Sequence, residues 1–565
     1  MQSFFRKITL IINLQEKKKL LLLIFIGFLS ALMQTFSLYL FFLIININLG
    51  VANDLKFIKF YEIFKSENQF MVFTIFIWFL SLVLSNINVI GNAKLSNTIG
   101  KKIKENIFKK ILFSNYLKLQ NFNSNYFINL ITIEVIRFQS GVIMSLVNLI
   151  SRFFLIIFLL FFLLIYETKI TIFSSIILLI IYFIVILFLK KRQFKNSQTI
   201  SSSNIRKISL IKSSIYSFKE IFLYGVQDYF IDKFKNSAEN FKLANSFNLS
   251  SSELPKYYIE FLIFVGIFFS ILYLLSSNTN LESTISTLSI FGLSAIKILP
   301  GINTIYVSQS VIRSNYNSVD SILNFYKNFE NQPNALINKN FNLSKIEYKN
   351  LFFSYKNENK ILNNLSLEIN PKSRIAIYGN SGTGKSTLIN ILIGVIKPNN
   401  GDISIFVSNK EKINGKYLSN FFSIVEQNSR IIEGDVVDNI AFGVNKKKVN
   451  FDKIVSVLKM VNMYDYFERN VDKLNTNLSE FGDRLSGGQS KRIAIARALY
   501  QDKPVIILDE PTNGLDEFNA QSIIKNILSL NKAIVMISHD EKFVKLFNEI
   551  YKLENFKLNM NKKQF

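Results

Sequence analysis

The chain has 565 residues, too many for one hydrophobic core, and 49% of them are hydrophobic. It has no cysteine and one histidine, which excludes disulfides, thiol catalysis, Cys-ligated zinc and a His-rich metal site. The formal net charge of +26 raises nucleic-acid binding as an alternative. We expect no nucleic-acid partner, because the lysines cluster beside apolar segments rather than in a patch interleaved with aromatic residues.

Apolar segments dominate residues 1–310. A helix that crosses a membrane needs about 20 mostly apolar residues, and this length predicts six membrane-spanning helices. The first is too long for the apolar part of a cleavable signal peptide, so we expect it to be retained. The predicted spans are residues 20–48, 70–94, 141–166, 169–190, 257–277 and 283–309.

The connections after the second and fourth spans are long and rich in lysine and arginine. The positive-inside rule therefore places both connections, and both chain termini, in the cytoplasm. On the outer side, Phe57, Phe60, Tyr61 and Phe64 recur at helical spacing after "ND", a plausible N-cap. This pattern predicts a short helix at the outer membrane surface, or equally one packed against neighbouring spans.

Residues 311–342 are polar, contain one proline and are predicted to be a linker. From residue 343 to residue 565, short β-rich runs alternate with helical segments, as in an α/β domain with a parallel sheet. The predicted architecture is a membrane α-helical domain with six transmembrane helices (1–310), followed by a linker and a cytosolic α/β domain (343–565).

The segment "SRIAIYGNSGTGKSTLINILIGV" has the pattern of a strand, a glycine loop and a helix, and contains the phosphate-binding motif G-x-x-x-x-G-K-[ST]. Its glycines allow backbone N–H groups and the helix N-terminus to face phosphate oxygens. Lys385 is expected to contact the β- and γ-phosphates of ATP, and the Ser386 hydroxyl to bind Mg²⁺. The predicted nucleotide-binding residues here are Gly379, Asn380, Ser381, Gly382, Thr383, Gly384, Lys385, Ser386 and Thr387.

A second apolar strand, in "KPVIILDEPTNGLD", ends in two carboxylates. Asp509 is expected to hold Mg²⁺ through its water shell, and Glu510 to polarise the attacking water. Without the glycine loop, a solvated turn would explain an Asp-Glu pair equally well. With it, acids at the carboxyl end of a buried strand lie where the site of an α/β domain is expected.

Between these motifs lies "LSGGQSKRIAIARALY", residues 485–500. LSGGQ resembles the signature of ATP-binding-cassette (ABC) ATPases, and the remaining motifs follow in that family's order. The resemblance implies a P-loop NTPase domain of the ABC type. It also implies that Tyr355 stacks on adenine, that Gln427 is a catalytic residue that senses and ligates Mg²⁺ and faces the membrane domain, and that Asp516 is the D-loop aspartate.

The single histidine, His539, ends the apolar strand "AIVMIS" about thirty residues after Glu510, where the ABC family has its switch-loop histidine. The resemblance implies that His539 is catalytic and contacts the γ-phosphate, the water and Glu510. One departure is Ser479, which stands where the family usually has glycine before Glu480 and Gly482, and this makes cross-talk between domains less certain.

In the ABC family, the signature segment completes the nucleotide site of a second subunit. Ser486, Gly487, Gly488 and Gln489 are therefore expected at the phosphates held by a partner's P-loop. Six spans and one cassette per chain resemble an exporter-type half-transporter, which implies two chains and alternating access driven by ATP hydrolysis. A homodimer is the simplest expectation, and a heterodimer is the alternative.

The substrate is indicated by few residues. Arg152 and Lys297 are cations inside predicted spans, and an intramembrane cation is a functional hypothesis by default. Phosphate or pyrophosphate headgroups would be their partners. Lys256, at the start of the fifth span, is instead expected to extend to the membrane surface.

The sixth span, "STISTLSIFGLSAIKILPGINTI", and the predicted outer helix resemble the lipid-linked oligosaccharide flippases of bacterial protein glycosylation. This resemblance implies a multi-pass protein of the bacterial inner (plasma) membrane that flips a polyprenyl-pyrophosphate glycan or another glycolipid. The alternatives are a lipid A or multidrug-type exporter, and a membrane ABC ATPase with a regulatory role.

Overall fold

The chain divides into two units, Met1–Ser114 with Lys118–Gln332, and Asn115–Leu117 with Pro333–Phe565. Most of the predicted outer helix, including Phe57, Phe60 and Tyr61, lies outside the described residues, as do Ser381, Ser479, Glu480 and Gly482. The computed structural model describes residues 2–48, 63–64, 66–276, 281–329, 342–355, 361–380, 382–408, 412–469, 473–478 and 485–560.

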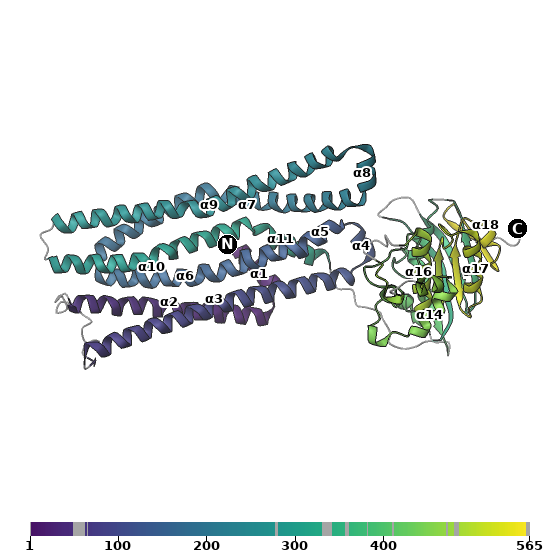
Figure 1. The fold of residues 1–565 in the computed structure, drawn as a ribbon, viewed down its shortest axis with the longest axis horizontal. Helices are drawn as coiled ribbons and strands as arrows, with labels where there is room; N and C mark the ends of the chain where they lie inside the picture. Colours follow the sequence, from purple (N-terminus) through teal and green to yellow (C-terminus); the bar gives the residue numbers. More distant parts are fainter. Residues whose placement is uncertain are drawn as a thin grey trace. The chain divides into compact units, whose positions relative to one another are not determined.

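The first unit is a bundle of long helices that run side by side (Figure 1). The helix α3 pairs with α2, α6 packs on α10 and on α2, and α7 pairs with α9. The helical elements are α1 (Gln2–Ile11), α2 (Leu14–Asn48), α3 (Glu67–Leu112), α4 (Tyr116–Gln120), α5 (Ser124–Asn129), η3 (Leu130–Glu134), η4 (Arg137–Met144), α6 (Ser145–Tyr166), α7 (Thr168–Tyr216), α8 (Phe218–Tyr224), α9 (Gln227–Ser276), α10 (Leu281–Ser314) and α11 (Tyr316–Asn328).

Within the described part of the chain, 4 helices are long and apolar enough to cross a membrane. These helices contain the first, second, third and sixth predicted spans, and α7 and α9 occupy the predicted fourth and fifth. The helices α3, α7 and α9 continue well beyond the apolar segments into the basic connections. The four stretches are residues 14–48, 67–112, 124–166 and 285–314.

Hydrogen bonds between polar side chains join neighbouring helices of the bundle. The amide nitrogen of Gln193 in α7 donates to Ser251 of α9 at 3.0 Å and to Ser310 of α10 at 2.7 Å. The amide of Asn92 in α3 donates to Asn148 of α6 at 2.9 Å. Asn92 and Asn148 lie within predicted spans, where such hydrogen bonds hold helices together because burial alone gives little preference between lipid and protein contacts. Gln193, Ser251 and Ser310 lie just beyond the predicted spans.

The residues predicted to be a linker are in part helical. The helix α10 continues to Ser314, α11 follows, and the division between the two units falls after Gln332. Val319 and Phe325 of α11 are fully buried, in one cluster with Ile99 of α3. The polar composition of residues 311–342 conceals this apolar face, which only one helix side carries.

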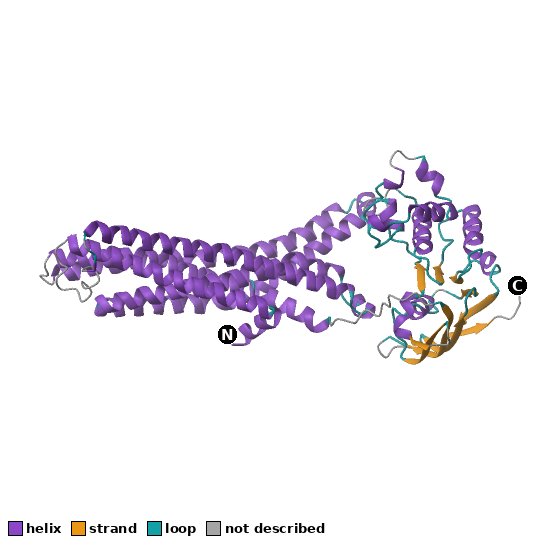
Figure 2. Ribbon diagram, turned by 90° about the horizontal axis from the view of Figure 1, so that it is seen from below, coloured by secondary structure: helices purple, strands orange, loops and turns teal. Residues whose placement is uncertain are grey.

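The second unit contains all the strands in the described part of the chain (Figure 2). One sheet has four strands in the order β2-β1-β4-β5, and the other has six in the order β10-β9-β3-β8-β7-β6. The strands are β1 (Leu343–Phe353), β2 (Leu362–Ile369), β3 (Arg374–Tyr378), β4 (Asn400–Val407), β5 (Lys412–Asn414), β6 (Phe422–Val425), β7 (Val505–Asp509), β8 (Ala533–Ile537), β9 (Glu549–Glu554) and β10 (Lys557–Met560).

The helices of the second unit cover the six-stranded sheet, whose central strands are buried on both faces. Ile506 and Leu508 of β7 join one core cluster, and Val505 and Ile507 join the other. This alternation is expected of parallel strands that are covered on both faces. The helices are α12 (Lys385–Leu392), η5 (Gly415–Asn420), α13 (Val436–Ile440), η6 (Lys446–Lys448), α14 (Phe451–Met460), α15 (Tyr464–Glu468), η7 (Lys473–Asn475), α16 (Gly487–Tyr500), α17 (Glu517–Leu528) and α18 (Glu541–Val544).

Candidate functional site

Four neighbouring strands, β3, β8, β7 and β6, are parallel. Their carboxyl ends therefore meet at one edge of the sheet. The glycine loop follows β3, Asp509 ends β7, and His539 and Gln427 each follow the end of their strand by two residues. The topology thus gathers four motifs that are up to 160 residues apart in the sequence (379 to 539).

The glycine loop requires glycine at defined positions. A Cβ on Gly379 would lie 2.5 Å from the carbonyl oxygen of Leu553 in β9, too close for any side chain. Gly384, the N-cap of α12, has a φ of +96°, which residues with a side chain rarely adopt. The loop is therefore a tight turn that leads directly into a helix N-terminus, the geometry suited to phosphate oxygens.

Lys385 begins α12 and folds back over the loop. Its ammonium donates to the carbonyl oxygens of Gly379 at 2.7 Å and Asn380 at 3.0 Å, and lies 2.8 Å from Nε2 of His539. Burial lowers the pKa of Lys385, and the nearby carboxylates of Glu510 and Asp509 partly oppose that shift. The loop thus holds a lysine whose ammonium donates to carbonyl groups of the loop itself.

The remaining loop residues lie around this lysine. The Thr383 hydroxyl donates to the carbonyl of Asn380 at 2.9 Å, and Ser386 is exposed at the start of α12. The hydroxyl of Thr387 lies 3.4 Å from that of Tyr355, whose ring packs edge-on against Phe353 at 4.9 Å between centroids. Tyr355 therefore contacts the helix α12, which follows the glycine loop.

The two acids at the end of β7, Asp509 and Glu510, have different environments. Burial and the adjacent charge of Glu510 raise the pKa of Asp509 to about 6. Glu510 has a φ of +45°, in the left-handed region, and only 8% of its surface is exposed. Such a strained backbone persists only where surrounding contacts hold it, and is common at functional sites.

Three side chains surround the carboxylate of Glu510. The amide nitrogen of Gln427 donates to Oε2 at 2.9 Å, and that of Asn513 donates to the same oxygen. The other oxygen, Oε1, lies 3.2 Å from Nε2 of His539. Gln427 and Asn513 therefore orient the carboxylate of Glu510, and the exposed imidazole of His539 lies beside its other oxygen.

The oxygen groups at the carboxyl edge of the six-stranded sheet suit the binding of Mg²⁺. The Ser386 hydroxyl, the Asp509 carboxylate and the Gln427 amide oxygen are hard oxygen ligands of the type that Mg²⁺ prefers. A cation beside Asp509 would also relieve the repulsion that raises its pKa. In the described residues, no group of three or more His, Asp or Glu forms a metal cluster. Mg²⁺ held with nucleotide phosphates and waters does not require one.

The signature residues begin α16. The Ser486 hydroxyl accepts from the N–H of Gln489 at 3.2 Å, and the Gln489 side chain accepts from the N–H of Ser486 at 2.8 Å, so the two form a capping box. A Cβ on Gly488 would lie 2.6 Å from the carbonyl oxygen of Gly514, which explains the glycine there. Gly487 has open space around its Cα.

Asp516 closes the segment that follows Glu510. It is the N-cap of α17, where its side chain accepts from the N–H of Asn519 at 3.0 Å. Its hydrogen bonds to Asn519 lower the pKa of Asp516, so the carboxyl group remains ionised. The described contacts of Asp516 thus give it a structural role at a helix N-terminus.

Comparison with known proteins identifies this domain. A family model described as "ABC transporter" matches residues 362–513, which include the glycine loop, the signature and the acid pair. The second unit contains an ABC transporter ATPase domain.

The ATPase domain has many relatives. The lactococcin-G-processing and transport ATP-binding protein LagD of Lactococcus lactis subsp. lactis is 34% identical over 226 residues, 40% of this chain and 32% of that protein. An ATP-dependent lipid A-core flippase of Saccharophagus degradans is 26% identical over 366 residues, 64% of this chain and 61% of the flippase. The chain thus spans about a third of the first relative and under two thirds of the flippase.

A solved structure matches the fold of both units. It is a bacterial Atm1-family ABC exporter with ATP bound, with a TM-score of 0.75 at 17% identity over 96% of this chain and 94% of that one. The chain therefore has the ABC exporter fold, which confirms the predicted class of helical membrane domain and α/β ATPase domain.

Sequence reasoning missed two residues of the ATPase domain site. Asn513, on the turn after Glu510, donates to its carboxylate. Lys491 of α16 is only 3% exposed, and its ammonium donates to the carbonyls of Glu426 at 2.9 Å, Gln427 at 3.0 Å and Asp509 at 3.3 Å. Burial lowers the pKa of Lys491. A lysine beside an apolar run, "IAIA", was the signal available in the sequence.

The predicted substrate residues lie in the first unit, on packed helices. Lys297 lies on α10 and Arg152 on α6, and these two helices pack against each other. Neither forms an ion pair with another described residue. Lys256 of α9 instead lies 3.9 Å from Glu260, one turn further along the same helix.

Proposed function

We propose that the chain is an ATP-driven exporter that flips an amphiphilic, anionic lipid, with a lipid-linked pyrophosphate oligosaccharide as the favoured substrate. One arrangement supports ATP hydrolysis above all others. Glu510 is held by Gln427 and Asn513 and lies 3.2 Å from His539, which in turn lies beside Lys385 of the glycine loop.

This arrangement suits the hydrolysis of ATP whose terminal phosphates contact the ammonium of Lys385. Glu510 would accept a proton from water, as a general base within hydrogen-bonding reach of its target. His539 would hold the water and the terminal phosphate, and Lys385 would stabilise the charge on the phosphates. Mg²⁺, bound by Ser386 and Asp509, would supply further charge stabilisation when present.

A second copy of the chain is the proposed partner. The signature helix α16 presents Ser486, Gly487 and Gly488 at its N-terminus, where backbone N–H groups and the helix dipole favour phosphate. Because each chain carries one glycine loop and one signature, a homodimer gives two complete sites. A heterodimer with a related chain is the alternative.

An anionic substrate is supported by Arg152 and Lys297. Two cations on packed apolar helices, without an acid partner in the described residues, would be compensated by a phosphate or pyrophosphate. The relatives named lipid A-core flippases also favour a phosphorylated glycolipid, and make lipid A-type export the second candidate.

The test is ATP-dependent flipping by the purified chain in proteoliposomes. The cargo is a fluorescent polyprenyl-pyrophosphate oligosaccharide, with Glu510→Gln as the inactive control. We expect movement by the wild type only, and less movement by the double variant Arg152→Gln/Lys297→Gln. Hydrolysis without movement of this cargo would refute the glycan assignment. Movement of a lipid A analogue instead would establish the second candidate.

A further inference from the structure

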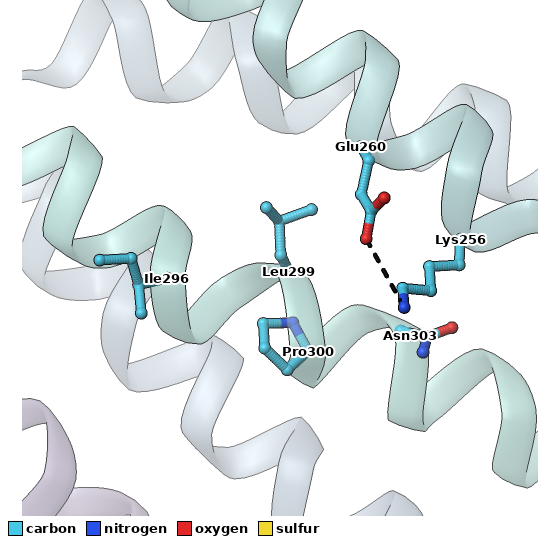
Figure 3. Close-up of a pocket in the computed structure, with 6 residues that line it drawn as sticks. All are labelled: Lys256, Glu260, Ile296, Leu299, Pro300 and Asn303. Carbon is cyan, nitrogen blue, oxygen red and sulfur yellow. Dashed lines mark ion pairs between the residues drawn. The ribbon is translucent and has the colours of Figure 1, made fainter.

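A cavity of about 310 Å³ lies between α9 and α10, in the first unit. Figure 3 shows that Lys256 and Glu260 reach it from one helix, and that the other lining residues come from the facing helix. The cavity is large enough for a small ligand group. Its lining consists of Lys256, Glu260, Ile296, Leu299, Pro300 and Asn303.

The cavity is distinct from the Arg152–Lys297 pair. Its residues on α10, Ile296, Leu299, Pro300 and Asn303, are spaced at i, i+3, i+4 and i+7, and therefore share one face of the helix. Lys297 is one position, about 100° around the helix, from Ile296 and does not line the cavity. The two sites thus use different faces of α10.

The polar groups of the cavity are not fully paired. Nζ of Lys256 and Oε1 of Glu260 are 3.9 Å apart, an ion-pair distance that is too long for a hydrogen bond. Oδ1 of Asn303 is buried and has no hydrogen-bond partner among the described residues. Pro300 has no N–H, so the carbonyl of Ile296 lacks its usual helical donor. The cavity therefore offers the ammonium of Lys256 and the carboxylate of Glu260 to a ligand.

The cavity also has a polar end and an apolar end. Lys256 precedes the predicted fifth span, and Asn303 lies near the end of the predicted sixth, so both are close to the same membrane surface. Leu299 and Ile296 lie about 6 and 10 Å deeper along α10. With the cytoplasmic connections predicted above, the polar end is level with the headgroups of the inner leaflet.

We propose that this cavity binds a zwitterionic headgroup with a phosphate and a primary ammonium, carried by an inner-leaflet lipid of the phosphatidylethanolamine type. The lipid phosphate faces Lys256. Its ammonium donates to the carboxylate of Glu260. Ile296 and Leu299 contact the start of an acyl chain.

Charge balance favours this headgroup over an anionic one. Lys256 and Glu260 together carry no net charge, so a headgroup with both charges gives each of these two side chains a partner of opposite charge. A phosphate without an amine would lie beside the Glu260 carboxylate and be repelled. The proposal rests on the proposed function only for the orientation of the helices in the membrane, because its chemistry comes from the cavity.

The experiment measures equilibrium binding to the purified full-length chain, without ATP, by isothermal titration calorimetry. The probes are dihexanoyl phosphatidylethanolamine, dihexanoyl phosphatidylglycerol and free phosphoethanolamine. We expect the wild type to bind the ethanolamine lipid about tenfold or more tightly than the glycerol lipid, because charged hydrogen bonds are lost with the latter. Free phosphoethanolamine should bind more weakly than its lipid. Equal affinity would overturn the assignment to a lipid.

Variants test the individual groups. Glu260→Gln should weaken binding of the ethanolamine lipid about tenfold and strengthen binding of the glycerol lipid, a gain that unfolding cannot produce. Lys256→Gln should weaken both. The matched control is Glu253→Gln, which is exposed on the same helix and should bind as the wild type does.

The outcomes separate this proposal from the proposed function. Lipid preference that is unchanged in Glu260→Gln would refute the cavity site, even if the chain flips the glycan lipid. If Glu260→Gln loses the preference for the ethanolamine lipid over the glycerol lipid and Glu510→Gln keeps it, the cavity site is supported, even if no cargo is transported. Each proposal therefore fails on its own measurement.

Discussion

Nε2 of His539 lies 3.2 Å from Oε1 of Glu510 and 2.8 Å from Nζ of Lys385. A ring nitrogen has either a proton or a lone pair, so Nε2 cannot donate to Glu510 and accept from Lys385 at the same time. The two contacts are alternatives. A phosphate that engages Lys385 would free Nε2 to face Glu510 and a water molecule.

His539→Ala is therefore expected to lower ATP hydrolysis by about 10²-fold, the usual contribution of a positioned proton-transfer group. ATP affinity should remain close to that of the wild type, because Lys385 and the glycine loop are intact. Steady-state hydrolysis and fluorescent-nucleotide binding measure the two effects. A parallel loss of both would show that His539 holds the loop rather than the reaction centre.

Glu510→Gln keeps the volume of the side chain but removes the charge that Gln427, Asn513 and His539 surround. Hydrolysis should fall by about 10²–10³-fold, with nucleotide binding retained. Glu517→Gln is the control, since Glu517 is exposed on α17 and pairs with Lys542 at 2.9 Å. Near-normal ATP hydrolysis by Glu510→Gln would show that Glu510 is not the general base.

The pKa of Asp509 predicts a dependence of stability on pH. It is raised from 3.8 to about 6, so the folded state retains a proton between these values when the unfolded state has lost it. The free energy of unfolding therefore falls as pH rises from about 4 to 6 and is level above. In the absence of Mg²⁺ at pH 7.5, Asp509→Asn should raise it by about 1–3 kcal/mol.

Thermal unfolding in detergent, with EDTA, measures this effect, and the difference between wild type and Asp509→Asn should be smaller at pH 4.5. Adding Mg²⁺ and ATP should raise the melting temperature of the wild type more than that of the variant. Identical shifts for both proteins would argue against a role for Asp509 in holding the metal.

Lys491→Met removes the ammonium that joins the carbonyls of Glu426, Gln427 and Asp509. Because Gln427 and Asp509 are the proposed metal-site residues, the Mg²⁺ concentration for half-maximal hydrolysis should rise several-fold, together with a loss of about 1–3 kcal/mol in stability. Lys525→Met, an exposed position on α17, is the control. A loss of stability with unchanged Mg²⁺ dependence would restrict Lys491 to a structural role.

Glu134 and Arg137 form a buried ion pair at 3.1 Å in the first unit, and Arg137 also donates to Ser314 and Asn315. Arg137→Met should destabilise the protein by about 3–5 kcal/mol, because the buried carboxylate of Glu134 loses its cationic partner and keeps only the amide of Asn129 at 3.4 Å. The double variant Glu134→Gln/Arg137→Met should recover part of that loss. A double-mutant cycle of melting temperatures measures the coupling, and additive effects would contradict it.

Much of the molecule follows from sequence alone, because its determinants are local. About 20 apolar residues predict a membrane helix wherever they occur, and a glycine loop between a strand and a helix predicts phosphate binding. The order of the motifs, from Tyr355 to His539, indicated the ABC resemblance. The helical membrane domain followed by an α/β domain is confirmed by the fold comparison.

Contacts between distant residues were decided only by the tertiary structure. The strand order β3-β8-β7-β6 brings His539 to Lys385 and Gln427 to Glu510, and no local pattern specifies that order. Lys491 resembles a surface residue until its burial is known. Likewise, the cavity between α9 and α10 exists because two antiparallel helices place Lys256 opposite Asn303, a pairing through space that neither segment encodes by itself.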